Sequence, residues 1–241
     1  MKPILIIKTG QALSSIPAEK GNFEDWIISK MGISREQAII AEVYNGFDLP
    51  PWDEVSGIVI TGSSSMVTEG HDWSEKTAKW LVNGIKKDLP ILGICYGHQL
   101  LAYALGGEVG KNPQGCEFGT VNIYFNDNTL DDQLFRGLPQ TIKAHVCHQQ
   151  SVLKLPDNAI ALGFSERDNY QAFRMGDRVW GVQFHPEFDG DVLRDYINYD
   201  REPLLKDQQD PDRLIEEILD TPHSHEILKR FTKVVKEVAS V

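Results

Sequence analysis

Residues 90–99, with the sequence PILGICYGHQ, hold a cysteine in a setting that favours nucleophilic chemistry. A short apolar run ends at Cys95, glycines stand two residues before and two after it, and a helical pattern follows. This pattern predicts a sharp turn from strand to helix, which needs flanking glycines because nearby backbone leaves no room for side chains. The first N–H groups of the helix would stabilise negative charge on the sulfur and on an oxyanion. Cys95 is therefore our candidate nucleophile, with a buried structural cysteine as the alternative.

A cysteine nucleophile also needs a proton shuttle and a group that orients the shuttle. His185 stands near the end of the apolar run VWGVQFHPEF, and Glu187 follows two residues later. Residues two apart on a strand share a face, so the imidazole and the carboxylate could lie side by side. A histidine at the end of a strand is also commonly just exposed. The order Cys, His, Glu along the chain separates the pattern from α/β-hydrolases, where the acid precedes the histidine.

The elements around these residues indicate an α/β fold. Continuous apolar runs predict strands that are covered on both faces, and apolar residues at spacings of three and four predict helices. The expected strands are 4–7, 38–43, 57–61 and 91–95, and the expected helices are 23–31, 73–87 and 98–105. Strands that alternate with helices favour a parallel sheet.

Beyond Leu105 the pattern changes to short runs separated by Gly and Pro, which predict antiparallel strands and hairpins. These runs are 120–125, 159–164, 171–175 and 178–184, with Gly176 and Asp177 as one turn. From about Asp191 the apolar spacing predicts a pair of packed amphipathic helices, one of which starts at Asp210 and Pro211. We therefore expect a central, mostly parallel sheet, a small antiparallel sheet and a C-terminal helical extension.

The composition limits the classes of partner and the compartment. The chain has 241 residues and a formal net charge of −11, which disfavours nucleic acid and anionic membranes as partners. Its three cysteines are widely spaced and fit neither a disulfide framework nor a CxxC metal site. The first apolar run is too short for a signal peptide or a membrane span. We expect a cytoplasmic protein that needs no metal and no cofactor.

Two segments of the chain together resemble a known family. GICYGHQLLAYALGG, followed further along by GVQFHPEF, resembles the triad-type (class I) glutamine amidotransferases, including the glutaminase part of GMP synthetases. The GxCxGxQ turn, the glycine pair after its helix, the segment 117–119 (EFG) and the QFHPE box occur in the family's order and spacing, from the first strand to about residue 196. The resemblance implies a three-layer α/β fold over residues 1–195, with residues 196–241 as a helical extension packed on the same domain. It also implies Cys95 as nucleophile, His185 as general base and then acid, and Glu187 as the carboxylate that orients His185.

The resemblance further implies roles in substrate binding. Gln99 matches a family glutamine that contacts the substrate glutamine. Backbone N–H groups of Tyr96 and Ser63 would form the oxyanion hole, although many relatives read Gly-Gly-Pro where this chain has Gly62, Ser63 and a second serine. A family loop that begins with histidine holds the substrate's α-amino and carboxylate groups, and GMP synthetases have His-Gly-Asp there. In this chain the corresponding loop residues are His148, Gln149 and Gln150.

The expected activity is hydrolysis of the γ-amide of glutamine, or of a γ-glutamyl small molecule, through a γ-glutamyl thioester. The products would be glutamate and either ammonia or an amine. No synthetase pattern follows in the sequence, so ammonia would pass either to a separate synthase subunit or to no acceptor at all. The CYGHQ sequence and the helical tail also resemble plant γ-glutamyl peptidases, which keeps peptide hydrolysis open. A binding or regulatory module that has lost turnover is the non-enzymatic alternative.

Overall fold

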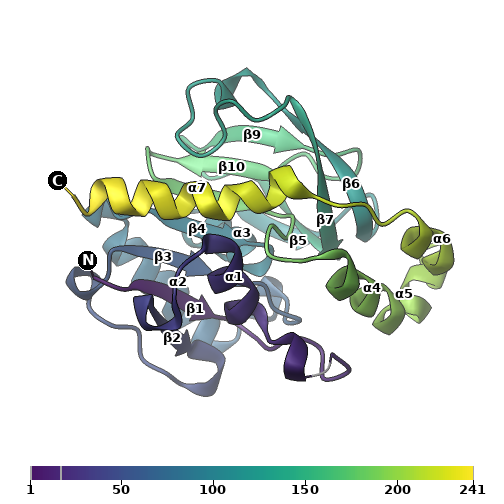
Figure 1. Cartoon of the computed structure of the whole chain (residues 1–241), viewed down its shortest axis with the longest axis horizontal. Helices are drawn as coiled ribbons and strands as arrows, with labels where there is room; N and C mark the ends of the chain where they lie inside the picture. The colour runs from purple at the N-terminus through teal and green to yellow at the C-terminus, as the bar shows by residue number, and fades with distance from the viewer. Residues whose placement is uncertain (1, 17, 241) are drawn as a thin grey trace.

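The structure, a computed structural model of the chain, describes residues 2–16 and 18–240. Its centre is a nine-stranded sheet in the order β2-β1-β3-β4-β11-β10-β9-β6-β7 (Figure 1). The parallel half comprises β1 (Ile4–Lys8), β2 (Ala38–Glu42), β3 (Gly57–Ile60), β4 (Ile91–Ile94) and β11 (Val179–Val182). The antiparallel half comprises β6 (Glu117–Phe125), β7 (Thr141–His148), β9 (Ile160–Phe164) and β10 (Ala172–Met175). A separate antiparallel pair is formed by β5 (Glu108–Lys111) and β8 (Gln150–Lys154).

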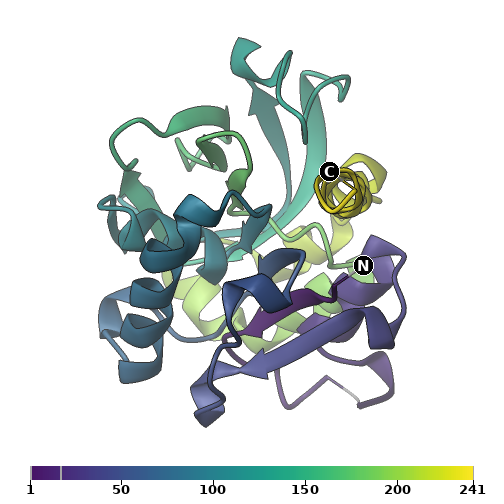
Figure 2. The same cartoon turned by 90° about the vertical axis from the view of Figure 1, so that its left-hand side faces the viewer.

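Helices cover both faces of the parallel half, so the molecule has three layers. On one face lie α1 (Phe23–Met31) and α7 (Pro222–Val238), and on the other lie α2 (Asp72–Gly84) and α3 (Tyr96–Ala104). Figure 2 shows α7 end-on at one side of the sheet and the pair α2 and α3 at the opposite side. Three shorter helices, α4 (Gly190–Tyr199), α5 (Arg201–Lys206) and α6 (Pro211–Glu216), precede α7. The expected fold class is confirmed.

Local sequence signals account for the first elements. Every residue of β1, β3 and β4 is buried, as continuous apolar runs require when both faces of a strand are covered. Helix α1 begins at a capping box formed by Asn22 and Asp25. It ends at Gly32, whose φ of 65° places it in the left-handed region that favours glycine.

The pairing of β11 differs from the prediction. We expected residues 178–184 as part of an antiparallel hairpin, and the hairpin with β10 does form around Gly176. On its other edge, however, β11 pairs in parallel with β4, so that Val182 lies opposite Ile94. The expected hairpin strands therefore extend the main sheet, while the small antiparallel sheet consists of β5 and β8. Hairpin signals are local, whereas the partner on the second edge is set by tertiary packing.

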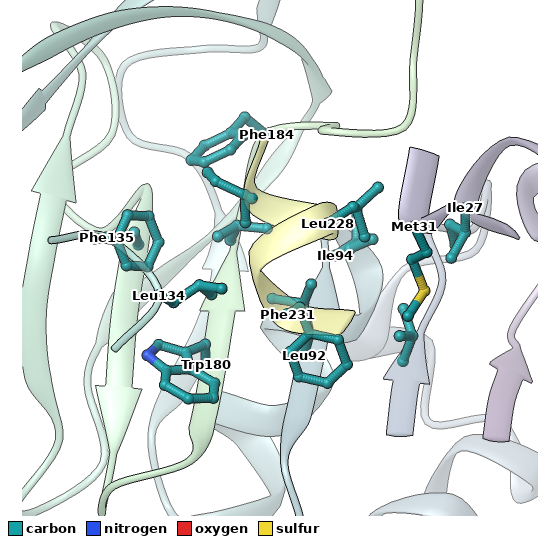
Figure 3. Packing of buried hydrophobic residues seen from close by; sticks show 14 of the residues in the cluster. Ile27, Met31, Leu92, Ile94, Leu134, Phe135, Trp180, Phe184, Leu228 and Phe231 are labelled. Carbon is teal, nitrogen blue, oxygen red and sulfur yellow. The ribbon is translucent and has the colours of Figure 1, made fainter. Parts of the chain in front are cut away.

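Residues 190–240, the described part of the C-terminal tail, form four helices rather than the expected pair. Asp210 caps α6, with Pro211 at its first position, as the sequence predicted. Helix α7 supplies Leu228 and Phe231 to the cluster that holds Trp180 and, from β4, Leu92 and Ile94 (Figure 3). The tail therefore contributes directly to the main hydrophobic core. Among the helices of the described ranges, none has the length and apolar character needed to cross a lipid bilayer.

Replacing Phe231 by alanine tests how far the core depends on α7. The side chain is fully buried, so its removal leaves a cavity between α7 and the sheet. We expect the free energy of unfolding in urea to fall by about 3–5 kcal/mol. The control Lys229→Ala changes an exposed residue of the same helix. It should shift the free energy of unfolding by less than about 0.5 kcal/mol. Equal losses in the two variants would contradict a core role for α7.

Candidate active site

Cys95 occupies the turn between β4 and α3, and its backbone is strained. Its φ of 49° is unusual for any residue other than glycine. A Cβ atom on Gly97 would lie 2.5 Å from the carbonyl oxygen of Ile60, and one on Gly93 would collide with the carbonyl of Gly97. Both flanking glycines are therefore required by close backbone contacts. The predicted sharp turn from strand to helix is confirmed.

Gly97→Ala measures the steric demand of this turn. The new methyl group must displace the backbone of β3 or α3, so we expect the free energy of unfolding to fall by about 1–3 kcal/mol or more. Gly110→Ala is the matched control, because its Cβ would meet only the tip of the flexible, half-exposed Leu153 side chain. Urea denaturation of both variants gives the comparison. A loss at Gly97 no larger than that at Gly110 would count against a tightly packed turn.

His185 and Glu187 form a buried pair beside the turn. His185 Nδ1 lies 2.8 Å from Glu187 Oε1, and the imidazole stacks on Phe188 with ring centroids 4.0 Å apart. We expected strand alternation to bring the pair together, but β11 ends at Val182, so the turn after the strand does so instead. Burial alone lowers the pKa of His185, but Glu187 and Cys95 outweigh it through charge and hydrogen bonds and raise the pKa to about 10. The imidazolium form is therefore favoured next to the sulfur.

The loop after β3 and the start of α3 each present one backbone donor near Cys95. Thr9 Oγ1 donates to the carbonyl oxygen of Gly62 at 2.9 Å, and Ser63 Oγ donates to the carbonyl oxygen of Thr9 at 2.9 Å. Within the part of the chain that the structure describes, the backbone N–H groups of Ser63 and Tyr96 donate to no other group. A Cβ on Gly62 would lie 3.0 Å from His185 Cε1, so glycine allows the loop to approach the imidazole. Both free donors belong to residues that line the same cavity.

Gln99 lies on the first turn of α3 with its amide nitrogen already bonded. Its Nε2 donates to the carbonyl oxygen of Gln150 at 2.8 Å and to Gln183 Oε1 at 2.9 Å. The side-chain carbonyl of Gln99 accepts no hydrogen bond from the described residues, which leaves it available to a ligand. Strand β7 ends at His148 and β8 begins at Gln150, so Gln149 alone connects them.

The His148 side chain is buried in a polar network. Its Nε2 lies 3.0 Å from Glu117 Oε2, and its Nδ1 lies 3.0 Å from the carbonyl oxygen of Gln150. Burial lowers the pKa of His148, but the hydrogen bond and charge of Glu117 outweigh burial, and the net shift is upward. Both ring nitrogens lie within hydrogen-bond distance of acceptor oxygens. The ring thus holds the ends of β7 and β8 together at the cavity wall.

A cavity of about 240 Å³ joins most of the predicted site residues. Its lining includes Ser63, Cys95, Tyr96, Gln99, His148, Gln149, Gln150 and His185. Glu187 and Gly62 are outside the lining. Glu187 contacts His185 directly, whereas Gly62 leaves room for the imidazole by lacking a Cβ. Within residues 2–16 and 18–240, no group of three or more His, Cys, Asp or Glu side chains is arranged to hold a metal ion.

Sequence reasoning missed several residues of the cavity wall, among them Phe23, Cys147, Tyr196, Tyr199 and Asp200. The backbone carbonyl oxygen of Cys147 accepts a hydrogen bond from Cys95 Sγ at 3.9 Å. Burial raises the pKa of the Cys147 thiol well above its usual value, with Asp200 adding to the shift. The helical pattern around 191–200 was visible in the sequence, but nothing in it showed that this helix ends at the cavity.

Comparison with known proteins gives a consistent family match. A family model described as "Glutamine amidotransferase class-I" matches residues 33–199. Gamma-glutamyl peptidase 5 of Arabidopsis thaliana is 30% identical over 184 residues, which cover 74% of this chain and 72% of the relative. The glutamine-hydrolyzing GMP synthase subunit of Ignicoccus hospitalis is 36% identical over 142 residues, which cover 58% of this chain and 72% of the relative.

Solved structures agree on the fold. A glutamine amidotransferase from Thermotoga maritima superimposes with a TM-score of 0.73 at 23% sequence identity. The match covers 98% of this chain and 97% of that one. At this identity the similarity shows a shared fold alone. It extends over the C-terminal helices as well as the sheet.

Proposed function

Because the chain belongs to the class-I glutamine amidotransferase family, we propose that Cys95, His185 and Glu187 form the catalytic triad of a γ-glutamyl hydrolase. The observation that carries the proposal is the strained Cys95 facing a buried His185–Glu187 pair across one cavity. An imidazolium beside the sulfur keeps the thiolate available as the nucleophile. The substrate is glutamine or a γ-glutamyl compound.

In the proposed reaction, the Cys95 thiolate attacks the γ-carbonyl carbon and forms a C–S bond. Backbone N–H groups of Ser63 and Tyr96 stabilise the resulting oxyanion, and loss of one such donor typically costs roughly 3–4 kcal/mol. The C–N bond then breaks as His185 gives its proton to the departing nitrogen. Water, deprotonated by His185, attacks the γ-glutamyl thioester. Glutamate leaves, and the thiolate and the imidazolium are restored.

A small γ-glutamyl peptide is the substrate that we favour. The similarity to Arabidopsis gamma-glutamyl peptidases covers more of this chain than the similarity to GMP synthase subunits does. The loop residues Gln149 and Gln150 also differ from the His-Gly-Asp of GMP synthetases. Residues at the end of α4 line the cavity, so its wall extends beyond the strand ends that are followed by the triad residues. A peptide substrate would release an amine, and no ammonia acceptor would be needed.

A glutaminase subunit is the second candidate, and one observation favours it. The relative with 36% identity is one subunit of a GMP synthase, and its name describes that enzyme as glutamine-hydrolyzing. For this candidate the free glutamine amide is cleaved and ammonia passes to a separate synthase chain. The cytoplasm is the expected compartment for either candidate.

Substrate comparison on the purified chain separates these possibilities. Glutamate release is measured from glutamine and from an S-alkylated γ-glutamylcysteinylglycine, and we expect faster release from the peptide. A glutamine-like chloroketone should label Cys95, and added substrate should block the labelling. Glutamine hydrolysis that rises only when a synthase chain is added would instead favour the second candidate. No labelling and no turnover in the folded protein would indicate a non-catalytic binding module.

A further inference from the structure

Two buried threonines hold the backbone of the loop after β3. Thr9 directly follows β1 and Thr61 directly follows β3, and these two strands are parallel neighbours in the sheet. The two residues are 1% and 0% exposed. Thr9 Oγ1 and Thr61 Oγ1 each lie 2.9 Å from the carbonyl oxygen of Gly62, to which each can donate. Hydroxyl groups from two chain segments therefore converge on one carbonyl group.

The Ser63 side chain ties the same loop to the end of β1. Its Oγ donates to the carbonyl oxygen of Thr9 at 2.9 Å and accepts from the backbone N–H of Ser65 at 3.1 Å. A Cβ on Gly10 would lie 2.6 Å from Ser63 Oγ, so the two chain segments are in close contact. The loop is thus held on both sides of the peptide that joins Gly62 to Ser63.

The orientation of this peptide decides which group it presents to the cavity. The peptide is trans, and in a planar trans peptide the C=O and N–H bonds point in opposite directions. Because the threonine hydroxyls hold the Gly62 carbonyl, the Ser63 N–H points away from them. Ser63 lines the same cavity as Cys95. A peptide turned by half a rotation would instead present a carbonyl oxygen, which repels an oxyanion.

We propose that Thr9 and Thr61 are positioning residues that keep the Ser63 N–H directed at the oxyanion of the reaction. The inference rests on the proposed hydrolase function, in which Ser63 donates to that oxyanion. A donor that the fold already holds in place needs no reorganisation as negative charge develops on the substrate. Neither threonine is part of the cavity lining, so both act through the peptide and not on the substrate itself. Their hydroxyls therefore favour the transition state over the bound substrate.

Removing the hydroxyls singly and together tests this role. We expect Thr9→Val and Thr61→Val each to lower kcat by only about 2–5-fold, because the other hydroxyl still holds the Gly62 carbonyl. The double variant should lower kcat by about 100–1,000-fold, as loss of an oxyanion donor does, and leave KM nearly unchanged. Thr9→Ser keeps the hydroxyl and should retain most of the wild-type rate. A double variant with the wild-type kcat, or one that raises KM alone, would overturn the inference.

Thr232→Val is the matched control for loss of a buried hydroxyl. Thr232 is buried outside the cavity, and its Oγ1 lies 3.1 Å from the carbonyl oxygens of Met31 and Leu228. This variant also removes a buried, hydrogen-bonded hydroxyl, but it should leave kcat unchanged. Alkylation of Cys95 by iodoacetamide forms no carbonyl oxyanion, so its rate should be the same in wild type and double variant. A parallel loss of alkylation and turnover would show that the whole turn is disrupted, which contradicts a role limited to the oxyanion donor.

Backbone NMR separates this inference from the proposed function. We expect the Ser63 amide to be rigid in the wild-type chain and to show microsecond-to-millisecond exchange in the double variant. If the wild-type chain hydrolyses no γ-glutamyl compound, the hydrolase proposal fails, and Ser63 relaxation still decides whether the hydroxyls hold the peptide. Identical Ser63 relaxation in wild type and double variant would overturn the inference.

The single variants keep the inference testable if the double variant does not fold. Thr9→Val is then compared with Thr232→Val, since each loses one buried hydroxyl. A lower kcat in Thr9→Val alone, together with Ser63 exchange in that variant, supports the positioning role. Equal kcat values in the two variants would overturn it.

Discussion

Replacing Cys95 by alanine is expected to abolish turnover, lowering kcat by at least about 10⁴-fold, because loss of a nucleophile in a triad removes the covalent pathway. Glutamate release from glutamine and from γ-glutamyl peptide measures the loss. The positive φ of residue 95 is a property of the backbone and does not require the thiol, so the variant should still fold. Near-native circular dichroism and a cooperative unfolding transition would verify the fold.

The matched control is Cys116→Ala, which removes a cysteine outside the cavity. The Cys116 thiol, directly before β6, donates a hydrogen bond to Asp207 Oδ2. Because it lies outside the cavity, its loss should leave kcat unchanged. A Cys95→Ala variant that kept a substantial share of the wild-type rate would show that another group attacks the substrate. The triad assignment would then be wrong.

Glu187→Gln is expected to lower kcat/KM by about 10³–10⁴-fold, because the neutral amide does not hold the protonated Nδ1 of His185 as the carboxylate does. The 2.8 Å contact between Nδ1 and Oε1 is buried, so water does not replace the lost carboxylate. The charge of Glu187 also raises the pKa of His185. His185 must carry the proton that it gives to the leaving nitrogen, so activity falls as pH rises through this pKa. In the Glu187→Gln variant the pKa of His185 drops, and the alkaline limb of the pH–activity profile moves to lower pH.

The pH dependence of kcat/KM in wild type and variant measures both effects. Alkylation of Cys95 by iodoacetamide across the same pH range reports the sulfur independently of turnover. Glu216→Gln, which removes an exposed carboxylate of α6, should leave the rate and the profile unchanged. A Glu187→Gln variant with a native rate and an unshifted alkaline limb would show that Glu187 does not orient His185.

Local signals explain how much of the site could be predicted from sequence. The turn at Cys95 was predictable because the requirement for Gly93 and Gly97 arises from backbone contacts within one strand–turn–helix unit and its neighbouring strand. The His185–Glu187 contact was also expected, but for the wrong local reason. Strand β11 ends at Val182, so a turn, and not the pleat of a strand, brings the two side chains together.

The rest of the site depends on packing between distant segments. Apolar periodicity shows that a helix has a buried face, but it does not show what that face covers. Nothing in the sequence around Tyr196 and Asp200 indicates that α4 ends against β7, where both residues reach the cavity. In the same way, the parallel pairing of β11 with β4 sets the position of His185 relative to Cys95, and it follows from tertiary structure alone.

The most direct test of the proposed mechanism is detection of a γ-glutamyl thioester on Cys95. Wild-type protein is mixed with γ-glutamyl p-nitroanilide, a chromogenic γ-glutamyl amide, and quenched in acid within one turnover. Peptide mass spectrometry then locates the adduct. We expect a γ-glutamyl group on the peptide that carries Cys95, formed and lost at rates consistent with kcat and absent in Cys95→Ala. Steady turnover with no adduct, or with the adduct on another residue, would contradict the mechanism.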